Sequence, residues 1–183
     1  MLIRLLFVVM CFLIVVTTRR RVANERDWVF LLLGMFFTVL AETFWLFNIT
    51  LAIAVYCFVP VAYALRAANK KYVTVLIILS ILALPLGFWV RGSALSVSAI
   101  LYFFLYIAAV VAAARNLWIN VNYIPFSNRA LALSGMLLFL VCDICMVVSY
   151  MAQCSMAYLS GYATWVLFPL AQLILALSAL KWE

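Results

Sequence analysis

The chain has 183 residues, of which 72% are hydrophobic and only 9% charged, and its formal net charge is +7. Soluble domains are about 45–50% apolar and about 25% charged, so a water-soluble fold is excluded because it cannot bury this much apolar surface. Each lipid-spanning helix needs about 20 apolar residues, which leaves no room for a soluble domain beside the spans. We therefore expect residues 1–183 to form a single transmembrane domain.

Seven apolar runs follow one another along the chain, separated by charged residues and turn formers. Each is close to the length of a membrane-spanning helix, and tilt can absorb the shortfall of the shorter runs. The stretch 115–129 is too polar to span and is typical of a cytoplasmic interfacial segment. The sequence predicts an all-α integral membrane protein with seven transmembrane helices. The expected spans are residues 2–18, 28–48, 50–66, 72–90, 94–114, 130–151 and 161–181.

The basic residues gather on one side of the membrane when these seven spans alternate in direction. All of the 12 Lys and Arg residues except Arg4 and Arg91 fall on the side that carries the C-terminus. Cytoplasmic loops are enriched in Lys and Arg, so we expect the N-terminus outside and the C-terminus in the cytoplasm. The same rule explains the positive charge without a nucleic-acid partner. A bacterial inner (plasma) membrane is the expected location.

A short sequence pattern recurs in the second and sixth spans. A Gly-Met pair at 34–35 precedes Glu42, and a second pair at 135–136 precedes Asp143 at the same spacing. The third and seventh spans also resemble each other, since each contains a proline. Spans 1–3 and 5–7 are therefore possible parallel repeats joined by span 4, a 3+1+3 arrangement known from transporters.

Two of the five acidic residues lie inside apolar spans. Glu42 and Asp143 are at similar depth, about 20 Å from the cytoplasmic edge at 1.5 Å per residue. A charge at mid-membrane costs about 2.5–3.5 kcal/mol on insertion scales, so such a residue usually faces the bundle interior and marks a functional site. We expect both acids in one pocket toward the outside, with Arg4 and Arg91 as candidate cations. The other acids, Glu25, Asp27 and Glu183, are interpreted as solvated charges.

The chemistry of the pair depends on protonation. A low dielectric favours the neutral carboxyl, and a neutral acid beside an ionised one is an acid/base arrangement. The alternative is that Glu42 and Asp143 only hold helices together through hydrogen bonds. Polar and aromatic side chains near the acids are candidates for substrate binding: Thr38, Trp45, Tyr150 and Gln172. Tyrosines 56, 63, 102 and 106 are more typical of packing or of the membrane interface.

The cysteines and the absence of histidine bear on cofactors. Cys142 and Cys145 form a CxxC inside an apolar run, where cysteine behaves as a small hydrophobe. The sequence has no histidine, the commonest ligand of transition metals. We expect neither a metal site nor a cofactor.

Three segments resemble the YhhN-like family, which includes the lysoplasmalogenases. Residues 34–42 (GMFFTVLAE) resemble that family's apolar helix ending in Gly-Asp. Residues 134–143 (SGMLLFLVCD) resemble its Gly-x6–7-Ser-Asp helix, and residues 170–178 (LAQLILALS) resemble its closing Ala-Gln-Leu-Leu helix. The resemblance runs in order from residue 28 to residue 180.

The chain departs from the family pattern at five positions and lacks the usual eighth, N-terminal helix. The first family Asp is Glu42 here, and Ala41, Pro60, Cys142 and Phe168 replace Gly, His, Ser and Tyr. The family's His-x-x-Tyr becomes Pro60-Val-Ala-Tyr63, which adds Tyr63 to the substrate-binding candidates.

The resemblance implies hydrolysis of the vinyl ether bond of lysoplasmalogens, giving an aldehyde and a glycerophospho-base. A membrane lysophospholipid would be the partner, and Glu42 and Asp143 would be the catalytic carboxyls. Two other functions stay open: a small seven-helix transporter, with or without proton coupling, and a non-catalytic lipid-binding member of the family. Which carboxyl is the acid, the preferred head group and the oligomeric state also stay open.

Overall fold

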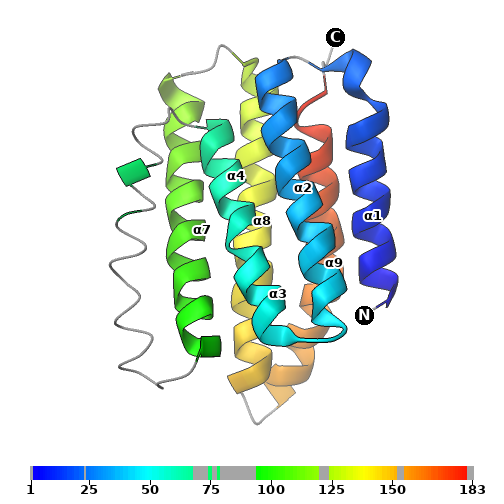
Figure 1. The fold of residues 1–183 in the computed structure, drawn as a ribbon, viewed down its shortest axis with the longest axis vertical. Coiled ribbons are helices and arrows are strands. Elements are labelled where there is room, and N and C mark those ends of the chain that lie inside the picture. Colours follow the sequence, from blue (N-terminus) through cyan, green and yellow to red (C-terminus); the bar gives the residue numbers. More distant parts are fainter. Residues whose placement is uncertain are drawn as a thin grey trace.

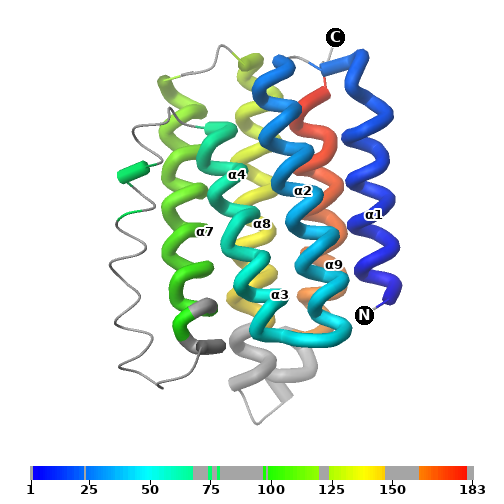
Figure 2. Tube along the Cα trace, viewed as in Figure 1, coloured from blue at the N-terminus to red at the C-terminus, as the bar shows by residue number. Residues whose placement is uncertain are grey.

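The described part of the chain is all-helical, as predicted. The computed structural model describes residues 2–22, 24–67, 74–75, 78, 94–119, 124–151 and 155–180 (Figure 2). The predicted span 72–90 lies outside the described residues except at three positions. The elements are α1 (Leu2–Thr17), η1 (Arg19–Arg21), α2 (Glu25–Trp45), α3 (Ile49–Tyr56), α4 (Phe58–Ala67), α7 (Ala94–Ile119), α8 (Phe126–Met151) and α9 (Ser155–Leu177).

These helices have the character of an integral membrane protein. Four described stretches are long and apolar enough to cross a membrane: Glu25–Trp45, Ile49–Ala67, Ala99–Ile119 and Phe126–Met146. Leu2–Thr17 and Gly161–Leu177 are shorter apolar helices. Large apolar side chains such as Val166 (68% exposed) face outward, whereas Glu42 and Gln172 are buried. Polar side chains inside and apolar ones outside are the arrangement expected where lipid surrounds the helices.

The described helices pack as a closed ring with roughly parallel axes (Figure 1). Each contacts the next in the order α1, α2, α3–α4, α7, α8 and α9, and α9 returns to contact α1. Helices α1, α3–α4, α7 and α9 run toward the end where the C-terminus lies, and α2 and α8 run back (Figure 1). That end also carries η1 and Arg66, and we call it the basic end.

Local sequence explains two boundaries that differ from the predicted spans. Helix α2 begins at Glu25 because the side chain of Asn24 accepts hydrogen bonds from the backbone N–H groups of Arg26 (2.9 Å) and Asp27 (3.3 Å). The predicted span 50–66 is divided between α3 and α4. Pro60 has no N–H to donate to the carbonyl four residues earlier, so the helix is interrupted near Cys57.

The predicted interfacial segment 115–129 is largely an extension of two helices. Helix α7 continues to Ile119 and α8 begins at Phe126, so the described part of this stretch is mainly helical. The guanidinium of Arg129 donates to the carbonyls of Asn116 (2.8 Å) and Leu117 (2.5 Å) near the C-terminal end of α7. A basic side chain there satisfies carbonyls that have no partner within the helix. Arg129 therefore caps the C-terminal end of α7.

Asp27 is not a solvated charge, contrary to the prediction. Its carboxylate accepts hydrogen bonds from Nε (2.6 Å) and Nη2 (2.7 Å) of Arg66 on α4, and both side chains are buried. Nη1 of Arg66 donates to the hydroxyl of Ser178 (2.8 Å), and the amide of Asn128 donates to the carbonyl of Ser178 (2.8 Å). These contacts tie α2, α4, α8 and the end of α9 together. The arginines near Asp27 in the sequence did not show that a distant one, Arg66, closes over it.

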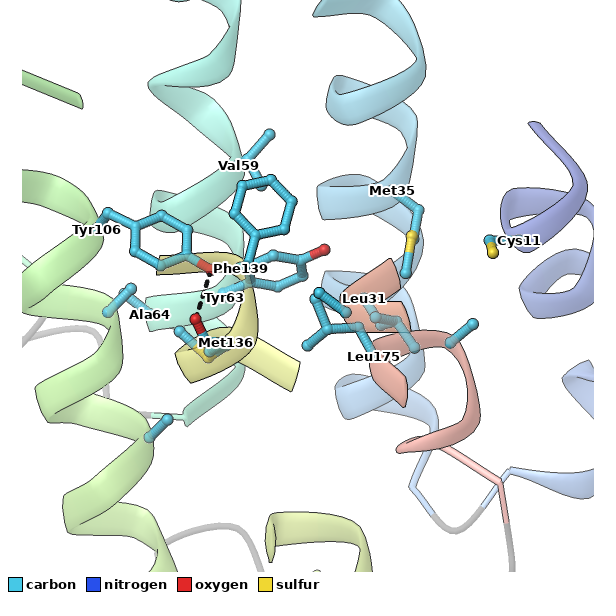
Figure 3. Packing of buried hydrophobic residues seen from close by; sticks show 14 of the residues in the cluster. Cys11, Leu31, Met35, Val59, Tyr63, Ala64, Tyr106, Met136, Phe139 and Leu175 are labelled. Atoms are coloured by element: carbon cyan, nitrogen blue, oxygen red, sulfur yellow. Dashed lines mark hydrogen bonds between the residues drawn. The ribbon is translucent and has the colours of Figure 1, made fainter. Parts of the chain in front are cut away.

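Glycine allows close packing in the centre of the bundle. A Cβ on Gly34 would lie 2.5 Å from Cε1 of Tyr63, and one on Gly135 would lie 2.7 Å from Cγ of Leu175. Both glycines belong to the repeated Gly-Met pairs of the sequence. Each packs against a large side chain from the next span. Figure 3 shows Tyr63, Leu175 and their neighbours in this core, where Tyr106 donates to the carbonyl of Met136 (3.1 Å).

Replacing Gly34 by alanine should loosen the contact between α2 and α4. The added methyl group overlaps the Tyr63 ring, and overpacking of a core typically costs about 1–3 kcal/mol. We expect Gly34→Ala to lower the unfolding temperature of the detergent-solubilised protein. Gly161→Ala is the matched control, since no described atom lies within 4 Å of its added Cβ. Equal unfolding temperatures for the two variants would contradict the packing described for Gly34.

Removing Arg66 should strongly destabilise the bundle. Arg66→Ala leaves the carboxylate of Asp27 buried without its cation, and breaking a buried pair in this way costs about 3–5 kcal/mol. The double variant Arg66→Met/Asp27→Leu should regain most of the stability, because no unpaired charge stays buried. Arg20→Ala, at an exposed arginine, is the control. The free energy of unfolding can be measured by titration with denaturing detergent, and a double variant no more stable than Arg66→Ala would refute the ion-pair explanation.

Candidate functional site

Helices α2 and α8 carry the two membrane acids to the same depth. Glu42 is seventeen residues after the first residue of α2, Glu25, and Asp143 is seventeen residues after the first residue of α8, Phe126. Both helices start at the basic end, and 1.5 Å per residue places each acid about 26 Å along its helix. The two carboxyls therefore lie in the half of the bundle away from the basic end, at matching levels.

Glu42 is buried and bound by two donors. Nη2 of Arg4 on α1 lies 2.7 Å from its Oε1, and the hydroxyl of Tyr56 on α3 donates to the same oxygen. The side chain of Glu42 is 4% exposed. The guanidinium of Arg4 also lies over the ring of Phe168 on α9, 3.7 Å from the ring centroid. Of the two cations considered from the sequence, Arg4 is thus the partner of Glu42, whereas Arg91 lies outside the described residues.

Asp143 has a different environment. The hydroxyl of Tyr102 on α7 donates to its Oδ2 at 2.5 Å. Asp143 is only partly buried, and it forms no ion pair within the described portion of the chain. One carboxyl is therefore paired with a cation and the other with a phenol.

Two aromatic rings connect the acids. Tyr56 and Tyr102 contact each other edge to face, with ring centroids 5.9 Å apart. Trp45 approaches the other side of Tyr56, at 6.5 Å between centroids. We call the connected residues Arg4, Glu42, Tyr56, Tyr102 and Asp143 the acid belt. The acid belt crosses the interfaces between α1, α2, α3, α7 and α8.

Among the substrate-binding candidates whose side chains the structure describes, Trp45 contacts the acid belt through the ring of Tyr56. Thr38 is fully buried one turn away from Glu42, and its hydroxyl donates to the carbonyl of Gly34 (2.9 Å). Tyr63 packs against Gly34, two turns of α2 from Glu42, and lines a small cavity with Asp27 and Arg66. The side chain of Tyr150 lies outside the described residues.

Gln172 is a buried polar group without a protein partner. Its side chain is 0% exposed, and neither Oε1 nor Nε2 has a hydrogen bond to any described residue. It lies one helical turn from Phe168, the ring beneath the guanidinium of Arg4, on the same face of α9. An amide buried in this way normally has a water molecule or a ligand as its partner. Gln172 therefore extends the polar region inward from the acid belt.

Sequence reasoning missed two members of the site. Tyr56 and Tyr102, interpreted from the sequence as packing residues, are the hydroxyl donors to the two acids. A weak signal was present, because each tyrosine belongs to a span next to that of its acid and lies toward the same end. The rotation of each helix decides whether such a hydroxyl reaches a carboxyl, and apolar spans without a clear polar face do not reveal that rotation.

The arrangement suits acid–base chemistry at the level of the acyl chains. Two carboxyls and two phenols lie in a low-dielectric interior, where protons and charges interact strongly. A carboxyl with a cation partner and a carboxyl without one are groups that can hold different protonation states, which is the basis of acid–base pairs.

Comparison with known proteins adds no relative to these observations. No family model, no curated protein and no solved structure matches this chain. A functional proposal therefore rests on the chemistry of the acid belt and on the sequence resemblance.

Proposed function

We propose that this protein is a membrane hydrolase that cleaves the vinyl ether bond of lysoplasmalogens. The observation that carries the proposal is the pair of carboxyls, Glu42 and Asp143, at one depth and connected through Tyr56 and Tyr102. A charge in an apolar span is expensive, and acids kept there are usually functional. The sequence resemblance to the YhhN-like family supplies the reaction class, since its two acidic helices match those of Glu42 and Asp143.

The reaction needs one proton donor and one anionic stabiliser. A carboxylic acid protonates the β-carbon of the vinyl ether, and the enol ether becomes an oxocarbenium ion that a nearby carboxylate stabilises. Water then adds to the cationic carbon and returns a proton to the first carboxylate, which gives a hemiacetal. The hemiacetal breaks into an aldehyde and the free hydroxyl of the glycerophospho-base, so one water molecule is consumed. The division of labour parallels that of two-carboxylate glycosidases.

Substrate binding follows from the surroundings of the acid belt. The vinyl ether lies where the tail of a lysophospholipid meets its glycerol, so a carboxyl reached from the lipid suits this bond. In the proposal, Trp45 flanks the chain of the lipid and Gln172 belongs to the polar part of the site, whereas Thr38 and Tyr63 support the core beneath it. The unpartnered amide of Gln172 supports a bound water there, as hydrolysis requires.

For the topology, we propose seven spans in a bacterial inner membrane, with the N-terminus outside and the basic end in the cytoplasm. The directions of the described helices support this order (Figure 1). Directions alternate from α1 to α4 and again from α7 to α9, and α7 runs the same way as α4, as one intervening span requires. The basic end also agrees with the enrichment of cytoplasmic loops in arginine and lysine. A parallel 3+1+3 repeat is supported by a shared feature of the two halves. In each half the acid of the second helix receives a donor from the first helix, Arg4 of α1 or Tyr102 of α7.

Cysteine labelling tests this topology. Phe47 (80% exposed) and Trp118 (86% exposed) lie at opposite ends of the bundle. In a background with all native cysteines replaced by serine, Phe47→Cys should react with a membrane-impermeant maleimide on intact cells. Trp118→Cys should react only after the membrane is permeabilised. The reverse pattern would invert the proposed orientation.

Neutralising either carboxyl should abolish hydrolysis. In detergent micelles, we expect Glu42→Gln and Asp143→Asn to lower aldehyde release from a lysoplasmenyl lipid by at least about 100-fold, the contribution of a positioned acid or base. Glu25→Gln, at an exposed acid of the same helix as Glu42, is the control and should keep full activity. An ordinary lysoacyl lipid should release no aldehyde.

Two results would contradict the proposed function. Full activity in both carboxyl variants would exclude the two-carboxyl mechanism. Absence of turnover in the folded wild-type protein, together with solute uptake by proteoliposomes, would identify a transporter instead.

A further inference from the structure

We propose that the two carboxyls have fixed and different protonation states, because Arg4 holds Glu42 as the carboxylate and Asp143 carries the exchangeable proton. Arg4 is then a positioning residue that assigns the roles within the acid belt. The catalytic meaning of this assignment rests on the proposed function, but the protonation states themselves do not.

The contacts of Glu42 are those of an anion. Nη2 of Arg4 and the hydroxyl of Tyr56 both donate to Oε1, so both recorded partners of the carboxyl are donors. The guanidinium does not lose its proton in proteins. Protonation of Glu42 would leave the charge of Arg4 without its counterion in a buried site, which is strongly unfavourable. The pair is therefore stable as carboxylate and guanidinium.

The position of Arg4 is fixed on two sides. Its guanidinium lies against the face of Phe168 on α9, 3.7 Å from the centroid, while Nη2 reaches Glu42 on α2. A cation over an aromatic face gains electrostatic attraction that grows with desolvation. Because the planar group is held by the ring below and the carboxylate beside it, Arg4 is directed to Glu42.

Among the described residues, the neighbours of Asp143 are neutral groups and one neutralised pair. On α7 the hydroxyl of Tyr102 donates to Oδ2. On α8 the thiol of Cys142 is directed to the carbonyl of Thr164 on α9 (3.8 Å). The nearby charges on α1 and α2 are those of Arg4 and Glu42, which neutralise each other, and Tyr56 on α3 donates to Glu42. A low dielectric without a counterion favours the neutral carboxyl.

This assignment fixes the two roles in the proposed reaction. Asp143 is the acid that protonates the vinyl ether carbon, and it recovers a proton from the water that attacks. Glu42 stays ionised throughout and stabilises the oxocarbenium ion. The exposure of the two side chains agrees with these roles, since Asp143 is partly exposed and Glu42 is almost fully buried.

Labelling with dicyclohexylcarbodiimide tests the protonation states without any lipid substrate. This apolar reagent adds a protonated carboxyl across one of its C=N bonds, and the adduct rearranges to a stable N-acylurea that retains all atoms of both reactants. Mass spectrometry of peptides from the folded wild-type protein should find the adduct on Asp143 and little on Glu42. Asp143→Asn should remove the main adduct.

Three arginine variants separate the charge of Arg4 from its shape. Arg4→Met should raise the labelling of Glu42 at least about tenfold, because the loss of its counterion favours the protonated form by more than the 1.4 kcal/mol that a factor of ten represents. Arg4→Lys keeps the charge and should keep Glu42 unlabelled. Arg20→Met, at an exposed arginine of the basic end, should leave the wild-type pattern unchanged. If Arg4→Met does not fold, Arg4→Met/Glu42→Gln should fold, since it removes both charges of the pair.

The possible results are distinguishable from those of the activity assay. Preferential labelling of Glu42 in the wild type, or no rise in Glu42 labelling in Arg4→Met, would overturn the assignment even if aldehyde were released. A protein that shows the expected labelling and no aldehyde release would retain the assigned protonation states and refute the hydrolase.

Discussion

The ion pair between Arg4 and Glu42 is the contact on which the rest of the site depends. A carboxylate inside an apolar bundle is tolerated only with a counterion and hydrogen-bond donors, and Glu42 obtains these from α1 and α3. Arg4 also packs on Phe168, so this single group joins α1, α2, α3 and α9. The position of α1 is thereby fixed against the helices of both halves, and the acid belt continues from Tyr56 to Asp143.

A second buried ion pair joins neighbouring helices at the other end of the bundle. Asp27 and Arg66 connect α2 to α4, and Ser178 and Asn128 extend the network to α9 and α8. Helix α2 therefore carries an acid near each end, and each acid meets an arginine from a neighbouring helix. Between these polar ends lies an apolar core in which Gly34 and Gly135 receive Tyr63 and Leu175. Directional contacts at both ends and the close packing at these glycines together set the register of the helices.

Composition and the helical rise predicted much of this architecture. They did not predict which side chains form ion pairs and hydrogen bonds with one another. The apolar content implied an all-α membrane bundle, and counting residues placed Glu42 and Asp143 at one depth. The burial of Asp27 was missed because a sequence shows which arginines are near in the chain, whereas burial depends on which helix packs over the side chain. Tyr56 and Tyr102 were similarly hidden, since their spans are apolar around the whole circumference and give no indication of the face that turns inward. The roles of Arg4 and Arg66 depend on the three-dimensional order of the helices.

The interruption at Cys57 gives the third span a mechanical property. Helix α3 has eight residues and begins at Asn48, whose side chain accepts a hydrogen bond from the N–H of Leu51 (3.0 Å). Tyr56 is its last residue, whereas Tyr63 and Arg66 belong to α4 beyond the break. The missing bond at Pro60 makes this the point at which the span bends most easily. Tyr56, which donates to Glu42, and Arg66, which pairs with Asp27, therefore lie on opposite sides of that point.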